Sequence, residues 1–177
     1  MASAPENLLK PPPTSSFVRE CLERIPHRSG GIALDIPCGL GRHTDLLAKR
    51  GMFVVAADLE DQCLRAISQA TRVGESVAPI RLNANHALPF RLDAFDLVTV
   101  VHALSLKVLA NAMPTVRAGG HIIFETYGAQ GGNWQSLPRP REVSETFSIR
   151  FDPVLYRERM VRGQRRAVTV KALFRRI

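Results

Sequence analysis

The segment ALDIPCGLGRHTDLLAKRG, residues 33–51, combines three features. An apolar run over 33–36 carries Asp35, the chain then turns through Gly39 and Gly41, and helical spacing of apolar residues begins at Arg42. A buried strand that ends in glycines and leads into a helix allows the backbone to approach a ligand closely. The segment therefore predicts a ligand site at the end of a strand.

The composition is that of one globular domain. A chain of 177 residues can form one substantial core, and the hydrophobic share of 45% and charged share of 23% are ordinary. Three consecutive prolines predict a flexible lead-in over 1–13, followed by a single domain over 14–177.

No run reaches the roughly 18 apolar residues of a membrane span, and the start lacks the apolar core of a signal peptide. Three widely spaced cysteines favour reduced thiols and no metal site. We therefore expect a cytoplasmic protein without a membrane partner.

The charge balance is basic, with a formal net charge of +8. Many of the arginines gather late in the chain, over 156–166 and 175–176. Such a balance allows nucleic acid, an acidic partner or an anionic substrate, and it selects none of them. No aromatic residues interleave with these arginines to stack bases, so a solvated basic edge is the favoured interpretation.

Helical spacing and apolar runs alternate along the chain. Helices are expected over 15–25, 42–50, 60–73, 105–118 and 141–146, and strands over 31–36, 52–58, 78–83, 94–104, 121–127, 147–158 and 165–175. Gly119 and Gly120 are expected to end the fourth helix. The alternation predicts an α/β fold, namely a Rossmann-like, doubly wound, mostly parallel sheet of seven strands with an antiparallel C-terminal hairpin.

Ligands of such sheets bind beyond the carboxyl ends of the strands. Asp58 ends the second strand about twenty residues past the glycines, where an acid binds ribose hydroxyls in nucleotide-binding folds. Thr44 occupies the position of the third glycine in a dinucleotide fingerprint, and the chain is too short to add a dehydrogenase's substrate domain. An adenosine ligand without a pyrophosphate fits better, which favours S-adenosylmethionine.

Four stretches together resemble the successive motifs of class I S-adenosylmethionine-dependent methyltransferases: LDIPCGLGRHTDLLAKRG, VVAADLE, LPFRLDAFDLVTVVHAL and RAGGHIIFETYG. The following segment, FETYGAQGGNWQSLPRPREV, further resembles small bacterial methyltransferases of the tellurite-resistance type. Pro37 departs from the usual Gly-x-Gly-x-Gly pattern. It fixes φ and removes a backbone donor, while the two later glycines, Gly39 and Gly41, are present.

The resemblance implies roles for residues along the predicted rim. Asp35 would order the first loop and face the methionine amino group, although it could instead cap the helix or pair with an arginine. Asp58 would bind the ribose, and Asn83 or Asn85 the adenine amino group. The implied cofactor-binding set is Asp35, Pro37, Cys38, Gly39, Gly41, Asp58, Leu59, Asn83, Ala84, Asn85 and His102.

Three strand-end residues are candidates for catalysis: His102, Glu125 and Tyr127. A poorly acidic nucleophile needs a base, whereas a lone histidine in an apolar strand is often a core residue. Asp96 is expected to be structural or to shape the rim, and His43 to be an exposed residue of the first helical turn.

The leading interpretation is a methyltransferase that acts on a small molecule, with a soft or anionic nucleophile. The chain lacks the Asp/Asn-Pro-Pro-Tyr/Phe signature after the fourth strand, which weighs against methylation of adenine or cytosine. The alternatives are a cofactor-binding module without turnover and an RNA methyltransferase. The loop over 128–140, with Asn133 and Trp134, is predicted to cover the acceptor.

Overall fold

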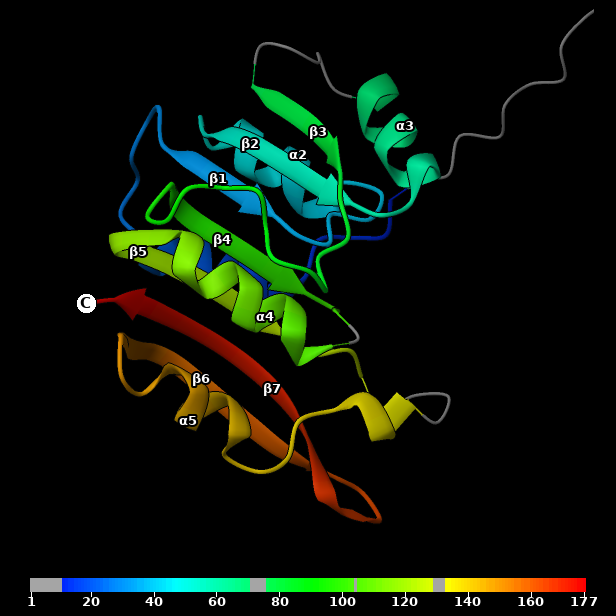
Figure 1. Cartoon of the computed structure of the whole chain (residues 1–177), viewed down its shortest axis with the longest axis vertical. Coiled ribbons are helices and arrows are strands. Elements are labelled where there is room, and N and C mark those ends of the chain that lie inside the picture. The colour runs from blue at the N-terminus through cyan, green and yellow to red at the C-terminus, as the bar shows by residue number, and fades with distance from the viewer. Residues whose placement is uncertain (1–10, 71–75, 104, 129–132) are drawn as a thin grey trace, which may run out of the picture.

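The computed structural model of the chain describes residues 11–70, 76–103, 105–128 and 133–177. One seven-stranded sheet runs through it in the order β3-β2-β1-β4-β5-β7-β6 (Figure 1). The strands are β1 (Ile32–Asp35), β2 (Phe53–Asp58), β3 (Val77–Arg81), β4 (Phe95–Val101), β5 (Val116–Glu125), β6 (Phe151–Val161) and β7 (Gln164–Arg176). Strands β1 to β5 are parallel, and β7 is antiparallel to both β5 and β6. The predicted sheet and its C-terminal hairpin are confirmed.

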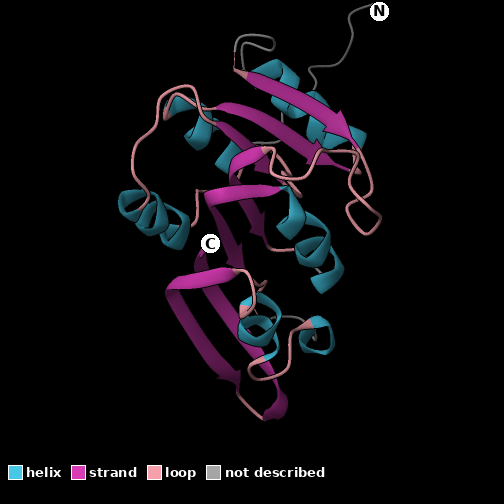
Figure 2. Cartoon of the chain, turned by 60° about the vertical axis from the view of Figure 1, so that its left-hand side comes forward, coloured by secondary structure: helices cyan, strands magenta, loops and turns pink. Residues whose placement is uncertain are grey.

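Helices cover both faces of the sheet, as Figure 2 shows. They are α1 (Ser16–Arg24), α2 (Arg42–Lys49), α3 (Asp61–Ala70), α4 (Leu106–Ala112) and α5 (Glu142–Phe147), with 3₁₀ turns η1 (Met113–Thr115) and η2 (Asn133–Ser136). Successive strand residues point to opposite faces, so Val54 packs in the core with α1, α2 and α3 whereas Val55 packs in the core with α4 and α5. This doubly wound arrangement buries the strands on both sides. Among the described residues, no helix has the length and apolar content needed to cross a bilayer.

The start of α1 agrees closely with its sequence signal. Ser15 is the N-cap, and its hydroxyl accepts hydrogen bonds from the backbone N–H groups of Phe17 and Val18. Just before it, the carbonyl of Pro13 accepts a hydrogen bond from Arg42, so this part of the proline-rich segment lies beside the start of α2. The rest of the predicted lead-in, residues 1–10, lies outside the described residues.

The start of β5 differs from the sequence prediction. The helix expected over 105–118 ends at Ala112, and β5 begins at Val116, so Gly119 and Gly120 lie inside a strand. Between the pairs Phe95–Val116 and Leu97–His121 the register shifts, which places a bulge at the glycines. A side chain at Gly120 would come within 2.9 Å of the carbonyl oxygen of Arg117. Glycine is required there by the bulge and not by a helix end.

The C-terminal hairpin carries much of the basic charge at an edge of the sheet. Its β6 strand is the last in the sheet order, and Arg159, Arg162 and Arg166 are exposed. Arg157 instead forms an ion pair with Glu20 of α1 at 2.5 Å. The favoured interpretation of these arginines as a solvated edge agrees with their exposure.

Candidate active site

A cavity of about 260 Å³ lies at the carboxyl ends of the strands, where the sheet order reverses between β1 and β4. This is the position where open α/β sheets bind ligands. The cavity collects residues that follow β1, β2, β3 and β4, which are far apart in the sequence. Its lining includes seven predicted site residues: Pro37, Asp58, Leu59, Asn83, Ala84, Asn85 and His102.

Asp58 is held at the cavity by the backbone of two loops. One carboxylate oxygen accepts the N–H of Gly39 at 2.8 Å, and the other accepts the N–H of Glu60 at 3.0 Å. Each oxygen can accept a further hydrogen bond, so the carboxylate can still bind a diol. Gly39 has φ +52, and a side chain there would meet nothing within 4 Å. The glycine turn is therefore both fixed to Asp58 and open to the approach of a ligand.

The opposite wall of the cavity combines apolar surface with amides. Leu59 is 47% exposed beside Asp58 and gives the cavity an apolar surface. Asn83 forms a turn in which its side-chain oxygen accepts the N–H of Asn85 at 3.0 Å. The amide of Asn111, on α4, donates to the carbonyls of Ala84 and His86 and so fixes this loop. Asn111 was missed by sequence reasoning, because nothing local links α4 to the loop.

Asp35 lies behind the cavity and is 1% exposed. Its two carboxylate oxygens accept hydrogen bonds from the hydroxyls of Thr44 at 2.6 Å and Thr99 at 2.7 Å. Burial raises the pKa of Asp35 to about 6, against the lowering effect of these hydrogen bonds. The contacts favour a role in ordering the glycine turn. Thr44, which stands at the position of the third glycine of a dinucleotide fingerprint, links Asp35 to the first turn of α2.

His102 follows β4 in an unusual backbone conformation, with φ +59. Its backbone N–H donates to the carbonyl of Glu125 at 2.8 Å, and its Nδ1 accepts a hydrogen bond from Arg42 at 2.9 Å. Burial, and next to it the Arg42 charge, lowers the pKa of His102. The ring is therefore neutral near pH 7, and because Arg42 can only donate, the ring proton is on Nε2.

Glu125 lies at the end of β5 and is 5% exposed. One oxygen forms an ion pair with Lys171 of β7 at 2.7 Å, and the other accepts the hydroxyl of Ser15 at 2.5 Å. Tyr127 is 46% exposed, and its ring meets the His102 ring edge-on at 4.9 Å between centroids. The three candidate catalytic residues are thus neighbours, although only His102 lines the cavity.

Several predicted residues lie elsewhere. The Cys38 side chain is buried in the core beneath α1 and α2, and burial raises the pKa of its thiol. Gly41 borders a second hollow, of about 390 Å³, beside Pro13 and the start of α2. Asp96 is structural, because it binds Arg28, Arg117 and the N–H of Ile32 at the amino ends of the strands, away from the predicted rim.

The prediction for His43 is wrong. The residue is 3% exposed, its Nε2 accepts the N–H of Ser15 at 3.3 Å, and burial lowers its pKa to about 4. The segment before α1 covers this turn of α2, which the local pattern around 42–50 does not reveal. The predicted acceptor loop lies partly outside the described residues, at 129–132, and its side chains at Asn133 and Trp134 are likewise outside them.

The cavity fits an adenosine-bearing ligand by its chemistry. Asp58 offers free acceptor positions for hydroxyl groups, and the exposed Leu59 offers an apolar surface. Asn83 and Asn85 offer amides beside that surface. Arg42 is a cation near the glycine turn, which suits a carboxylate on the same ligand.

Comparisons with known proteins agree with this chemistry. Residues 33–120 match the family described as Methyltransferase domain. Ubiquinone biosynthesis O-methyltransferase from Aliivibrio fischeri (strain MJ11) is 28% identical over 111 residues, which cover 59% of this chain and 47% of the relative. The chain thus spans about half the length of that curated relative.

Solved structures share the fold at low sequence identity. An S-adenosylmethionine dependent methyltransferase from Mesorhizobium loti superposes with a TM-score of 0.69 at 15% identity, covering 92% of this chain and 98% of that one. The [4+2]-cyclase SpnF superposes with a TM-score of 0.71 at 12% identity, covering 90% and 79%. The fold is therefore shared by proteins that are named for different reactions. The family match and the motif order at the rim together show that the chain belongs to the class I S-adenosylmethionine-dependent methyltransferases.

Proposed function

We propose that this protein binds S-adenosylmethionine in the cavity of Asp58 and His102 and transfers its methyl group to a small molecule with a soft or ionised nucleophile. One observation carries the proposal. Residues from four separate strand ends meet at one cavity and present a ribose acceptor, apolar surface and amides together. The finer resemblance to tellurite-resistance-type enzymes stays a prediction.

The chain's own residues divide into two groups in this proposal. Asp58 binds the ribose, and Leu59 contacts the adenine. Asn83 or Asn85 forms a hydrogen bond with the edge of the adenine ring. Arg42 and Nε2–H of His102 orient the other end of the cofactor. The bound cofactor supplies a methyl group on sulfur that is already strongly electrophilic, so the protein's main task is in-line positioning of the acceptor.

The contacts at the rim argue against a protein base for the acceptor. Nδ1 of His102 is occupied by Arg42, and its Nε2 carries the proton. Both oxygens of Glu125 are engaged, by Lys171 and Ser15. With His102 and Glu125 engaged in this way, transfer favours a nucleophile that is ionised or soft before it binds.

Calorimetry with S-adenosylmethionine and its demethylated product tests the cofactor assignment. Asp58→Asn should weaken binding by about 1.5–3 kcal/mol, the range for hydrogen bonds to charged groups. Asp61→Asn is the matched control, because Asp61 is an exposed acid nearby that pairs with Arg81. Equal affinity of wild type and Asp58→Asn would show that the ribose is bound elsewhere.

A methyl-transfer assay over carboxylates, thiols and phenols tests the reaction, with the demethylated cofactor as the measured product. We expect turnover of a small acceptor whose rate follows the ionised fraction of that acceptor. Cofactor binding without turnover on any class would favour the binding module. Methylation of RNA, with an affinity that falls steeply with salt, would favour the RNA interpretation.

A further inference from the structure

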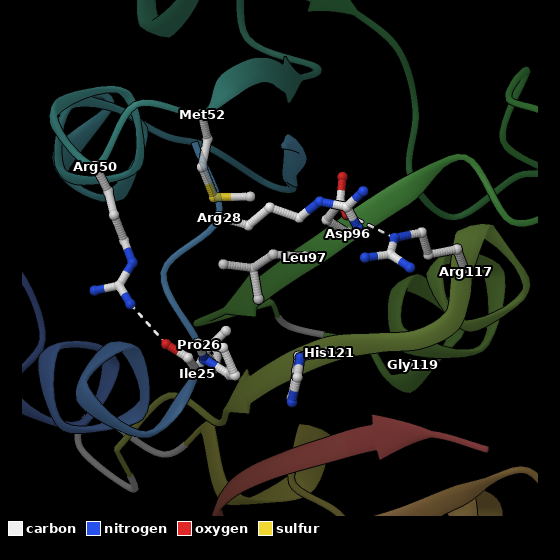
Figure 3. Close-up of a pocket in the computed structure, with 10 residues that line it drawn as sticks. All are labelled: Ile25, Pro26, Arg28, Arg50, Met52, Asp96, Leu97, Arg117, Gly119 and His121. Carbon is white, nitrogen blue, oxygen red and sulfur yellow. Dashed lines mark hydrogen bonds and ion pairs between the residues drawn. The ribbon is translucent and has the colours of Figure 1, made fainter. Parts of the chain in front are cut away.

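A further cavity lies at the amino ends of the strands, whereas the proposed cofactor site lies at their carboxyl ends. We call it the rear cavity and define it by Arg28, Met52, Asp96, Leu97, Arg117 and His121 (Figure 3). Its volume is about 170 Å³. No role proposed above uses it.

The bulge in β5 shapes the rear cavity. Four residues of β5, 117–120, lie between Val116 and His121, the two positions that pair with Phe95 and Leu97. The extra residues turn Arg117 toward β4, where its Nε donates to Asp96 at 2.6 Å. Bulges that re-aim a side chain in this way are common at binding sites. His121 follows directly after the bulge and lines the same cavity.

Positive charge exceeds negative charge around the rear cavity. Arg28 and Arg117 share one carboxylate, that of Asp96, which also accepts the N–H of Ile32 at 2.8 Å. Arg175 pairs opposite His121 on β7, and its guanidinium lies 3.8 Å from the position of a Cβ at Gly119. Arg175 has no carboxylate within ion-pair distance among the residues that the structure describes. The local field therefore favours an anion.

His121 supplies the second, independent observation. It is 9% exposed, and its ring has no hydrogen-bond partner within the described part of the chain. Burial, followed by the charges of Arg175 and Arg117, lowers the pKa of His121. The acids around it are Asp96, which lines the cavity and is paired with Arg28 and Arg117, and Asp152, which lies opposite Arg175 on β6. Buried polar side chains nearly always have a partner, so an unpartnered ring at a cavity wall points to a ligand.

We propose that the rear cavity binds a small organic carboxylate. The carboxylate contacts His121 together with the guanidinium groups of Arg28 and Arg175, while the apolar body of the ligand packs on Met52 and Leu97. A cavity of about 150 Å³ can hold a benzene ring, so the rear cavity is large enough for a body of that size. The mixture of guanidinium groups and apolar side chains favours such a ligand over a bare phosphate.

Binding of benzoate, inorganic phosphate and benzamide to the whole chain tests the proposal, by calorimetry and by the NMR signals of the histidine rings. Benzoate should bind saturably and shift the His121 signal, which is assigned as the one missing from His121→Asn. Benzamide has nearly the same shape without the charge, and it should bind about tenfold more weakly or worse. The affinity for S-adenosylmethionine should not change when benzoate is bound.

Variants separate the cavity from general charge effects. Arg28→Gln and Arg175→Gln should each weaken benzoate binding about fivefold or more, because each removes a charged donor at the site. Arg65→Gln removes the same charge from the exposed face of α3 and should leave the affinity unchanged. The proposal is overturned if Arg65→Gln weakens binding equally, if phosphate binds more tightly than benzoate, or if benzamide matches benzoate. No saturable binding of benzoate up to about 10 mM would also overturn it.

Discussion

Arg42 donates a hydrogen bond from its guanidinium to Nδ1 of His102 across 2.9 Å and so joins the first turn of α2 to the end of β4. The same guanidinium donates to the carbonyl of Pro13 at 3.2 Å. One side chain therefore links the segment before α1, the helix after the glycine turn and the ring that lines the cavity. It also fixes which nitrogen of that ring carries the proton.

Arg42→Gln should raise the pKa of His102. Burial is the larger cause of the low pKa and would remain, but the charge of Arg42 would be gone. An NMR titration of the ring C–H signals measures the change, with His102→Asn used for assignment. Arg65→Gln controls for the loss of one charge far from the ring. Identical titration curves for wild type and Arg42→Gln would show that Arg42 does not control this histidine.

Asp35→Asn should change how the stability of the protein depends on pH. The folded pKa of Asp35, about 6, lies above the ordinary value of 3.8, so the folded state binds the proton more tightly than the unfolded state. Stability from Asp35 is then greatest below about pH 4 and is lost as the pH rises through 6. Relative to wild type, the variant should gain about 3 kcal/mol between about pH 4 and pH 7.

Urea unfolding at a series of pH values measures this difference. Asp45→Asn is the matched control, because Asp45 is an exposed acid on the same helix that pairs with Lys49. A difference between Asp35→Asn and wild type that is independent of pH would contradict the prediction.

Gly41→Ala should cost more stability than Gly39→Ala. Both glycines have positive φ, which costs about 1–2 kcal/mol for an alanine. At Gly41 a Cβ would also lie 2.7 Å from Cγ1 of Ile67, whereas at Gly39 it would meet nothing. Overpacking adds about 1–3 kcal/mol, so we expect about 2–5 kcal/mol at Gly41. Chemical unfolding measures the loss of stability in the two variants. Equal losses would show that the contact with Ile67 adds no cost at Gly41.

Lys171→Met should destabilise the protein by about 1–3 kcal/mol, because it leaves the buried Glu125 carboxylate without its cation. Glu125→Gln in the Lys171→Met background should recover part of that loss. A double-mutant cycle by thermal or urea unfolding measures the coupling.

The Glu125→Gln variant also tests whether Glu125 acts as a base. Glu125→Gln alone should retain methyl transfer once an acceptor is identified, because the proposed reaction does not use this carboxylate. A large loss of turnover in Glu125→Gln, with cofactor affinity intact, would return Glu125 to the catalytic residues.

The class of fold could be predicted because its signals are local. The strand-to-helix turn at 35–42 and the acid at Asp58 each lie within one short segment, and apolar periodicity gave the order of strands and helices. The bulge in β5 could not be predicted in this way. Val116 to Gly120 looks like a helix end followed by glycines, and only pairing with β4 makes it a strand.

The contacts of the candidate site could be predicted less well than its members. His102 and Glu125 were recognised from their strand ends, but Arg42, Lys171 and Ser15 bind them from remote parts of the chain. His43 was misjudged for the same reason, since the residue that covers it lies 28 positions earlier. Burial by a distant segment leaves no mark on the local pattern.

The placement of β7 between β5 and β6 has a consequence for the order of folding during synthesis. Phe17 of α1 belongs to the same core cluster as Leu173 of β7, and Ser15 must find Glu125 at a separation of 110 residues. Contacts between such distant parts form slowly, because the intervening chain must first close into a loop. On the ribosome, α1 therefore emerges long before its partners and completes its packing only after the last strand has been inserted.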